Sequence, residues 1–506
     1  MSVATTVREV ERKLRVHGLF RLPELSELPG IVEAKAEPTR DLTAVYHDTA
    51  DLRLFRAGIT LRRREGGNDA GWHLKLPVGT AGDGVRDEIQ LPLSAGKIGE
   101  VPDELADLVT AHVREEKLVP VATLKNKRAP YLLTDEDGTA VVELTDDRVS
   151  VLDGREVVAK FREIEVEAVD SENTAILSRL VDAFVDLGAE PTKESKAATA
   201  LGPAATGRPD VEKVENATPS DPASQAIRAL LAKHVGRILV QDVRVRRDLP
   251  DSVHQMRVAA RRLRSGLQAF RPLLDKEWAN ELRTELKWIA GELSGIRDTE
   301  VMIERLEERA TVLPPDEADL ANSAVEAALR QQFTDARVHA LAAMRSQRYV
   351  DLLVRLVDAV NKPRLSDLAA EPCSQALPPL VEKTWKRLNR DVKQLRIDSA
   401  ATPWHETRIA AKKARYSAEA AEPVFGEPVK RLVKALESVT EILGDHQDAH
   451  VAQMTLRAMA ADVDGASGFA LGLLYGQEIE YEMALREEFT RLWPTIVRIH
   501  KKTQYT

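Results

Sequence analysis

Charged side chains of both signs alternate with apolar residues in short segments of the first 200 residues. Residues two apart in a strand share a face. The faces formed in this way are Glu9/Glu11/Lys13, Arg62/Arg64, His73/Lys75, Arg86/Glu88 and Glu163/Glu165/Glu167. Clustered carboxylates favour a hard divalent cation such as Mg²⁺ or Mn²⁺, and arginine and lysine favour phosphate oxygens. If the sheet closes on itself, these faces line a tunnel that suits a metal-chelated oligophosphate.

A second charged pattern lies on two helical segments of the C-terminal part. The first segment carries basic residues spaced three or four apart, with one neighbour beside them: His254, Arg257, Arg261, Arg264 and Arg262. The second repeats this stripe with His405, Arg408, Lys412, Arg415 and the neighbouring Lys413. One such stripe is most often a solvated helix face, but two in the same His-x-x-Arg register favour an anion ligand. A metal site at the histidines is disfavoured, because no matched carboxylates stand at ligand spacing.

The elements that must position these residues differ between the two parts of the chain. Residues 1–202 contain alternating strand patterns separated by turn residues, with helical patterns at 102–116 and 174–187. This part is predicted to be an α+β domain built on antiparallel strands. Residues 203–222 contain four prolines and few large apolar residues, which indicates a linker. Residues 223–506 have helical periodicity and few strand signals, which predicts an all-α domain.

The helical part contains an internal repeat. Residues 253–270 match residues 404–421 without gaps, at an offset of 151 positions. Residues 292–301 match 442–451 at an offset of 150. Two matches at nearly one offset predict a duplicated helical bundle, with repeats at about 223–360 and 380–501.

Bulk properties limit the class of protein. The 506 residues exceed one ordinary core, so a multidomain chain is expected. One cysteine, Cys373, excludes an intramolecular disulfide and fits a reducing compartment. We find no signal peptide and no apolar stretch near the roughly 20 residues of a membrane span, so a cytoplasmic location and no membrane contact are expected. The net charge of −9 first argues against a polyanion ligand, but local clusters decide the field that a ligand meets.

The first part resembles a known family. Glu9-Val10-Glu11-Arg12-Lys13 is similar to the ExExK signature that opens the CYTH, or triphosphate tunnel metalloenzyme, family. The likeness continues in the family's order through residues 46–49, 61–64, 72–75, 86 and 88, 128, 143–147, 163–165 and 195–196. It implies an eight-stranded antiparallel tunnel that binds a linear triphosphate. Family members include inorganic, thiamine and RNA triphosphatases and class IV adenylyl cyclases.

The resemblance also implies roles for individual residues of the tunnel. The residues that would hold a metal are Glu9, Glu11, Glu163 and Glu165, and these four with Lys13 form the expected catalytic set. Those that would bind phosphates are Lys13, Arg62, Arg64, Lys75, Arg86, Arg128 and Lys196. Either Asp146 or Asp147 would supply a further acidic position. The expected cofactor is Mg²⁺ or Mn²⁺.

The second part, from about residue 220 to 501, resembles the CHAD family of duplicated helical domains. This resemblance implies that inorganic polyphosphate binds along a basic surface or channel joining the two copies. The carried-over residues are those of both stripes: His254, Arg257, Arg261, Arg262, Arg264, His405, Arg408, Lys412, Lys413 and Arg415. Protonated histidine contacts phosphate best, so tighter binding is expected below about pH 6.5.

Together these features predict a metal-dependent triphosphatase, a hydrolase of phosphoanhydride bonds. Inorganic triphosphate is the expected substrate, and the enzyme is tethered to a polyphosphate-binding module that associates with polyphosphate granules. One alternative is a non-catalytic polyphosphate-binding adaptor of such granules, and another is a class IV-type adenylyl cyclase. The four carboxylates favour catalysis, because a simple anion binder has no need of them. Nucleic acid is disfavoured as a partner, because the basic helices lack interleaved aromatic residues.

Overall fold

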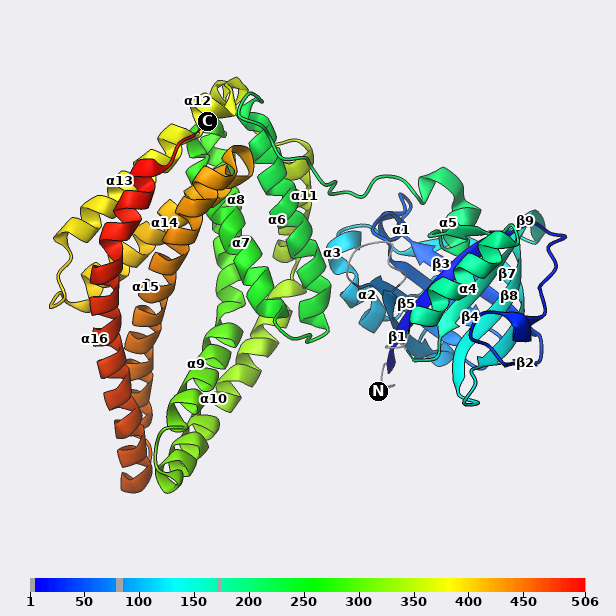
Figure 1. Cartoon of the computed structure of the whole chain (residues 1–506), viewed down its shortest axis with the longest axis horizontal. Coiled ribbons are helices and arrows are strands. Elements are labelled where there is room, and N and C mark those ends of the chain that lie inside the picture. The colour runs from blue at the N-terminus through cyan, green and yellow to red at the C-terminus, as the bar shows by residue number, and fades with distance from the viewer. Residues whose placement is uncertain (1–4, 79–84, 171–173, 506) are drawn as a thin grey trace. The chain divides into compact units, whose positions relative to one another are not determined.

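The computed structural model describes residues 5–78, 85–170 and 174–505 (Figure 1). The chain divides into two compact units, Met1–Asp210 and Val211–Thr506. The first unit is called the tunnel unit below and the second the helical unit. Among the described residues, no helix is long and apolar enough to cross a membrane.

The tunnel unit is built on antiparallel strands. They are β1 (Thr5–Val16), β2 (Glu33–Ala36), β3 (Arg40–Asp48), β4 (Thr60–Glu65), β5 (Gly71–Pro77), β6 (Val85–Pro92), β7 (Val119–Thr134), β8 (Ala140–Asp153), β9 (Glu156–Ala168) and β10 (Glu190–Thr192). Eight of them pair in the order β1-β6-β5-β4-β3-β7-β8-β9, and β9 pairs back with β1. The barrel is therefore closed, which confirms the predicted eight-stranded fold. Strand β2 adds to β7, and β10 adds to β1.

Short helices pack against the barrel. They are α1 (Arg53–Arg56), α2 (Asp103–Leu108), α3 (Thr110–Val113), α4 (Ala175–Asp186) and α5 (Lys196–Leu201). Helix α4 buries Leu177, Leu180 and Phe184 in a core that also contains Leu14 of β1 and Ile164 of β9. Because strand side chains alternate between faces, packing these apolar residues outward turns their charged neighbours toward the barrel interior.

The turn between β4 and β5 depends on glycine. Gly66 has φ +84°, and a Cβ there would come within 2.2 Å of the carbonyl oxygen of Asp41. Gly71 begins β5, where a Cβ would lie 2.4 Å from the carbonyl oxygen of Leu91 on β6. Larger side chains would therefore push the β4–β5 hairpin, which carries Arg62 and Lys75, away from the neighbouring strands β3 and β6.

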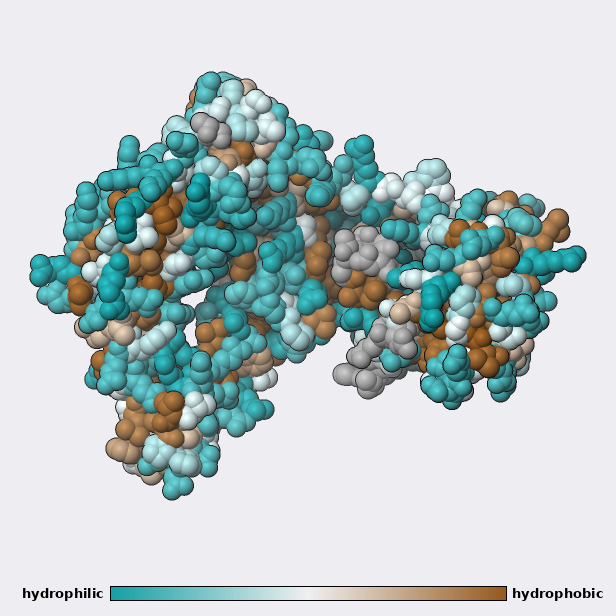
Figure 2. All heavy atoms as spheres, viewed as in Figure 1, coloured by the Kyte–Doolittle hydropathy of each residue, from teal (hydrophilic) through white to brown (hydrophobic). Residues whose placement is uncertain are grey.

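The helical unit is built mainly from long antiparallel helices, with one short helix, α12. They are α6 (Ala223–Arg246), α7 (Ser252–Ala269), α8 (Lys276–Glu292), α9 (Ser294–Ala310), α10 (Pro315–Met344), α11 (Gln347–Asn361), α12 (Cys373–Ala376), α13 (Pro378–Gln394), α14 (Ala401–Phe425), α15 (Glu427–Met459) and α16 (Gly465–Lys502). Figure 1 shows α9–α10 and α15–α16 as two hairpins that meet at their far ends, where their apolar faces share one core. Figure 2 shows mainly hydrophilic residues on the visible surface of this unit, as expected for helices that bury one apolar face.

The two predicted basic stripes lie on α7 and α14, which pack against each other. Their apolar positions face the interior, including Met256, Ala260 and Leu263 of α7 and Ala411 and Ala414 of α14. The small alanines allow the two helices to approach closely. This packing brings the charged faces of both repeats to one region of the bundle.

Candidate functional site

The barrel interior contains buried charges of both signs. Side chains from six different strands and one helix are less than one-tenth exposed: Glu11, Arg64, His73, Glu88, Asp147, Glu163, Glu165 and Lys196. Burying so many charges is costly unless each meets an opposite charge or a hydrogen-bonding partner. The interior is therefore organised as networks of ion pairs.

Lys196 is the centre of one network. It is the first residue of α5, and the preceding Ser195 caps this helix, since its Oγ accepts a hydrogen bond from the N–H of Ala198 at 3.1 Å. Lys196 Nζ lies 2.9 Å from Asp147 Oδ2, 2.8 Å from Glu163 Oε1 and 2.6 Å from Glu165 Oε1. Burial alone would lower the pKa of Lys196, but these carboxylates raise it well above its usual value. The ammonium is thus held charged.

Arg128 and Lys13 extend this network. Arg128 Nε and Nη2 donate two hydrogen bonds to Asp147, at 2.9 and 2.7 Å, and Nη2 also donates to Glu165 at 2.7 Å. Lys13 Nζ lies 3.1 Å from Glu11 Oε1 and 3.5 Å from Glu165 Oε1. Burial raises the pKa of Glu165, but Lys196, Lys13 and Arg128 lower it well below its usual range.

Lys75 is the centre of a second network. Its Nζ lies 2.5 Å from Glu9 Oε2 and 2.9 Å from Glu88 Oε2. Glu88 also pairs with His73 Nδ1, and His73 Nε2 lies 2.9 Å from the carbonyl oxygen of Asp69. Burial lowers the pKa of His73 to about 4, although its contact with Glu88 opposes this shift. The position of Glu88 is therefore fixed by two side chains of β5.

Arg62 and Arg64 leave donors free for a ligand. Among the described residues, the buried Nε atoms of both arginines have no hydrogen-bond partner. Burial, followed by the charges of Arg62 and Arg128, lowers the pKa of Arg64 to about 9. Arg62 also lowers the pKa of the buried Tyr46 phenol, against the effect of burial. Unsatisfied guanidinium donors are costly when they are buried away from water, and phosphate oxygens would satisfy them.

The carboxylates fit a hard divalent cation in their chemistry. Burial raises the pKa of Glu9 to about 8, against the opposing charge of Lys75. It also raises the pKa of Glu167 to about 7, and Glu11 and Glu165 add to this shift. Both pKa values stay raised despite the nearby Lys75 ammonium, so a bound cation would stabilise the ionised form of these carboxyl groups.

The lysines occupy part of this space. Within the part of the chain that the structure describes, no group of three or more His, Cys, Asp or Glu side chains is arranged to hold a metal ion. Lys13 and Lys196 stand among the carboxylates instead. A cation would therefore bind as lysine ammonium groups move from carboxylate to phosphate oxygens.

The structure brings together most of the residues predicted for the tunnel. The interior networks contain Glu9, Glu11, Lys13, Lys75, Arg128, Glu163, Glu165 and Lys196. Arg62 and Arg64 lie on β4 beside them, and Arg86 stands opposite Glu9 in the β1–β6 register. Glu88 and Glu167 were noted on charged strand faces but were not assigned roles. Glu88 and Glu167 stand two positions from the predicted Arg86 and Glu165, so this strand spacing could have added them to the predicted set.

Asp146 and Asp147 lie on opposite faces of β8. Asp147 faces the interior, where it contacts Arg128 and Lys196. Asp146 faces the other way and accepts two hydrogen bonds of 2.7 Å from Arg162. Neighbouring residues of a strand point to opposite faces, and Asp146 shares its face with Leu144 of the outer core.

The helical unit contains a cationic cavity of about 1150 Å³. Its basic lining residues come from α7, α8, α13, α14 and the turn after α7: Arg261, Arg264, Arg271, Lys276, Arg283, Lys287, Lys383, Arg387, His405, Arg408, Lys412 and Lys413. Among the described residues that line it, none is Asp or Glu. Burial, together with Arg408 and Arg261, lowers the pKa of Lys412 to about 7. Such crowding of like charges favours a polyanionic ligand.

Six of the ten predicted stripe residues line this cavity, namely Arg261, Arg264, His405, Arg408, Lys412 and Lys413. His254 and Arg257 are not among its lining residues, and Arg257 pairs with Asp298 at 2.9 Å. Arg262 and Arg415 instead pair with Glu419, at 3.3 and 2.8 Å. The lining residues of α8 and α13 belong to no repeated motif, so no sequence pattern singled them out.

Two domain families match the sequence over most of its length. Residues 7–196 match the CYTH domain, and residues 229–457 match the CHAD domain.

The chain belongs to the CYTH-CHAD family. It is 34% identical over 509 residues to the uncharacterized protein MT2285 of Mycobacterium tuberculosis (strain CDC 1551 / Oshkosh), a match that covers 95% of this chain and 94% of the relative. PptA from Streptomyces chartreusis is similar in structure, with 24% identity and a TM-score of 0.48 over 54% of this chain and 100% of PptA. The CHAD domain from the plant Ricinus communis has 24% identity and a TM-score of 0.45 over 56% of this chain and 94% of that domain. CYTH-CHAD membership implies a divalent metal cation, triphosphate handling and a link to polyphosphate.

Proposed function

We propose that this CYTH-CHAD protein hydrolyses inorganic triphosphate in its tunnel with Mg²⁺ or Mn²⁺, and binds inorganic polyphosphate in the cationic cavity. The observation that carries the proposal is the barrel interior, which contains buried arginine Nε donors without a partner and carboxyl groups whose pKa values burial raises. A metal-chelated linear triphosphate supplies the opposite charge to both kinds of group.

The carboxylates Glu9, Glu11, Glu163 and Glu165 would hold the cation, with Glu167 as an additional carboxylate beside Glu11 in the β1–β9 register. When bound, the cation supplies charge neutralisation on the phosphate oxygens. The guanidinium groups of Arg62, Arg64 and Arg128 orient the phosphate chain through paired hydrogen bonds, which keeps the scissile bond in line for attack by water.

The lysines contribute by exchanging partners. Lys196 and Lys75 are held charged by carboxylates before the ligand binds. Triphosphate would bind the lysine ammonium groups, and its cation would bind the carboxylates. Every buried charge would therefore keep a partner of opposite sign. This exchange favours ligand and cation together over either one alone.

Polyphosphate binding in the helical unit would support the tunnel reaction. A polymer held in the cationic cavity raises the effective concentration of short phosphate chains near the enzyme. The proposal places the protein where polyphosphate accumulates in the cytoplasm.

The test is phosphate release from inorganic triphosphate by the full chain, with Mg²⁺ or Mn²⁺, and with ATP and long polyphosphate as parallel substrates. We expect metal-dependent release that is lost in Glu9→Ala/Glu11→Ala. The matched control is Glu190→Ala, because Glu190 is an exposed residue of β10. No release from any substrate by a folded protein that still retains polyphosphate would refute hydrolysis and leave a binding role. Formation of cyclic AMP from ATP would instead identify a cyclase.

A further inference from the structure

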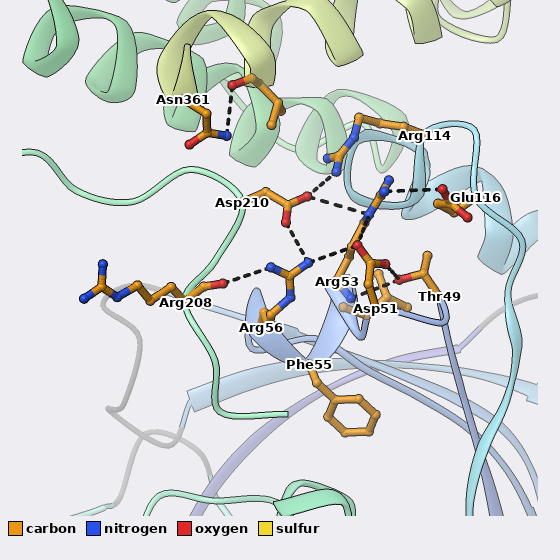
Figure 3. Close-up of polar contacts among 12 residues, drawn as sticks. Thr49, Asp51, Arg53, Phe55, Arg56, Arg114, Glu116, Arg208, Asp210 and Asn361 are labelled. Carbon is orange, nitrogen blue, oxygen red and sulfur yellow. Dashed lines mark hydrogen bonds and ion pairs between the residues drawn. The ribbon is translucent and has the colours of Figure 1, made fainter. Parts of the chain in front are cut away.

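Three arginines of the tunnel unit converge on one carboxylate of the segment that leaves it (Figure 3). Arg53 and Arg56 are the first and last residues of α1, and Arg114 directly follows α3. Asp210, the last residue of the tunnel unit, lies 2.7 Å from Arg56 Nη2 and 3.9 Å from Arg53 Nε, and it also pairs with Arg114 Nη2. Arg56 Nη1 donates a further hydrogen bond of 3.0 Å to the carbonyl oxygen of Arg208. The arginines thus hold the start of the linker.

The position of each arginine in this cluster is fixed by burial or by a further ion pair. Arg114 adopts φ +57°, which is unusual for a residue with a side chain, and its side chain is only 5% exposed. Burial lowers the pKa of Arg114, and Asp210 opposes this shift. Asp51 positions the other two arginines, at 2.9 Å from Arg53 and 3.3 Å from Arg56. The buried guanidinium of Arg114 therefore depends on an anion at the position of the Asp210 carboxylate.

The Asp210 carboxylate is a replaceable partner. Residues 205–222 form no helix or strand, so Asp210 is not fixed by a ladder of backbone hydrogen bonds. Guanidinium forks bind phosphate as well as carboxylate, and phosphate groups offer more oxygens and more negative charge. A short phosphate anion can therefore satisfy all three arginines at once.

We propose that Arg53, Arg56 and Arg114 form an anion site for phosphate or pyrophosphate, in which Asp210 is the resident intramolecular ligand. An anion that replaces Asp210 releases the start of the linker from the tunnel unit. None of the four residues lies on a barrel strand, so the inference does not rest on hydrolysis in the tunnel.

The test is limited trypsin cleavage of the full chain after Lys213, an exposed residue three positions beyond Asp210. Metal-free buffer of constant ionic strength is used, with pyrophosphate as the probe. We expect Asp210→Asn to be cleaved about tenfold faster than wild type, because it loses charge-assisted hydrogen bonds. We expect pyrophosphate to accelerate cleavage of wild type towards that rate, with little further effect on Asp210→Asn. The control for the change of charge is Asp186→Asn at the exposed end of α4, which should behave as wild type.

Two further variants locate the pyrophosphate effect. Arg62→Ala, in the tunnel, should retain the response, whereas Arg114→Gln should lose it. If Arg114→Gln does not fold, Arg56→Gln replaces it in the same comparison. The proposal is overturned if pyrophosphate leaves wild-type cleavage unchanged, if Asp210→Asn is cleaved at the wild-type rate, or if Arg62→Ala abolishes the response.

Discussion

Replacing Lys196 with alanine should destabilise the tunnel unit strongly, because it leaves three carboxylates without their shared cation. Lys196 Nζ lies within 2.9 Å of Asp147, Glu163 and Glu165, and only 8% of the residue is exposed. Arg128 remains as the partner of Asp147 and Glu165. Removing one partner of a buried ion pair costs about 3–5 kcal/mol, because the remaining charge stays buried without compensation.

Hydrogen exchange in the full chain can measure this loss in the tunnel unit alone. A cost of about 3–5 kcal/mol corresponds to amide exchange about 100- to 4,000-fold faster in β8 and β9, since about 1.4 kcal/mol is tenfold. The matched control is Lys193→Ala, which removes the same charge from an exposed position. We expect less than a twofold change there, because exposed charges contribute little.

The effect should also depend on pH in a defined direction. Burial raises the pKa values of Asp147 and Glu165, but Lys196 and neighbouring cations lower them below their usual range. Groups with depressed folded-state pKa values contribute stability that is present above about pH 4 and lost as pH falls through the folded values. The difference between wild type and Lys196→Ala should therefore be largest near pH 7 and shrink in acid. Exchange within fivefold of wild type at pH 7, or a difference that grows in acid, would refute this reasoning.

Three other predictions follow from the two sites. Burial raises the pKa values of Glu9 and Glu167 to about 8 and about 7, so cation binding must displace protons. Mg²⁺ affinity, measured by calorimetry, should rise from pH 6 to 9, and Glu167→Gln should flatten the rise; a flat wild-type profile would contradict it. Arg387 lines the cationic cavity, whereas the similarly exposed Arg390 of α13 is not among its lining residues. Arg387→Gln should make polyphosphate binding less salt-dependent, with a log–log slope lower by about 0.7–0.9, and Arg390→Gln should have a smaller effect; equal effects would count against the cavity. Because the pKa of Lys412 is about 7, polyphosphate affinity should fall as pH rises from 6 to 8. Lys412→Gln should show a flatter profile in the same titration, and an unchanged profile would exclude this lysine as the cause.

Local patterns were sufficient to predict the antiparallel strands and their charged faces, whereas the closed eight-stranded tunnel was implied by the family resemblance. Alternation placed Glu9 and Glu11 on one face of β1, and Arg62 and Arg64 on one face of β4. A strand period of two is a local property of the chain, so these faces could be predicted without knowing the neighbouring strands. The repeated His-x-x-Arg register likewise predicted the duplication and the basic faces of α7 and α14.

The partners of these faces could not be predicted in this way. Lys196 meets Asp147 only because the closed barrel brings the start of α5 to its interior, across 49 positions of sequence. The cationic cavity receives Arg283 from α8 and Lys383 from α13, whose local sequences carry no matching motif. The three arginines around Asp210 likewise meet only because α1 and α3 pack against each other.

The sequence by itself therefore determined which residue types share a strand or helix face, because that follows from backbone periodicity. Only the tertiary structure decided which charges are compensated by neighbours and which are left to a ligand. That balance depends on burial and on distances between elements remote in sequence, which periodicity does not contain. The same lysine is a solvated charge at position 193 and the shared cation of three carboxylates at position 196.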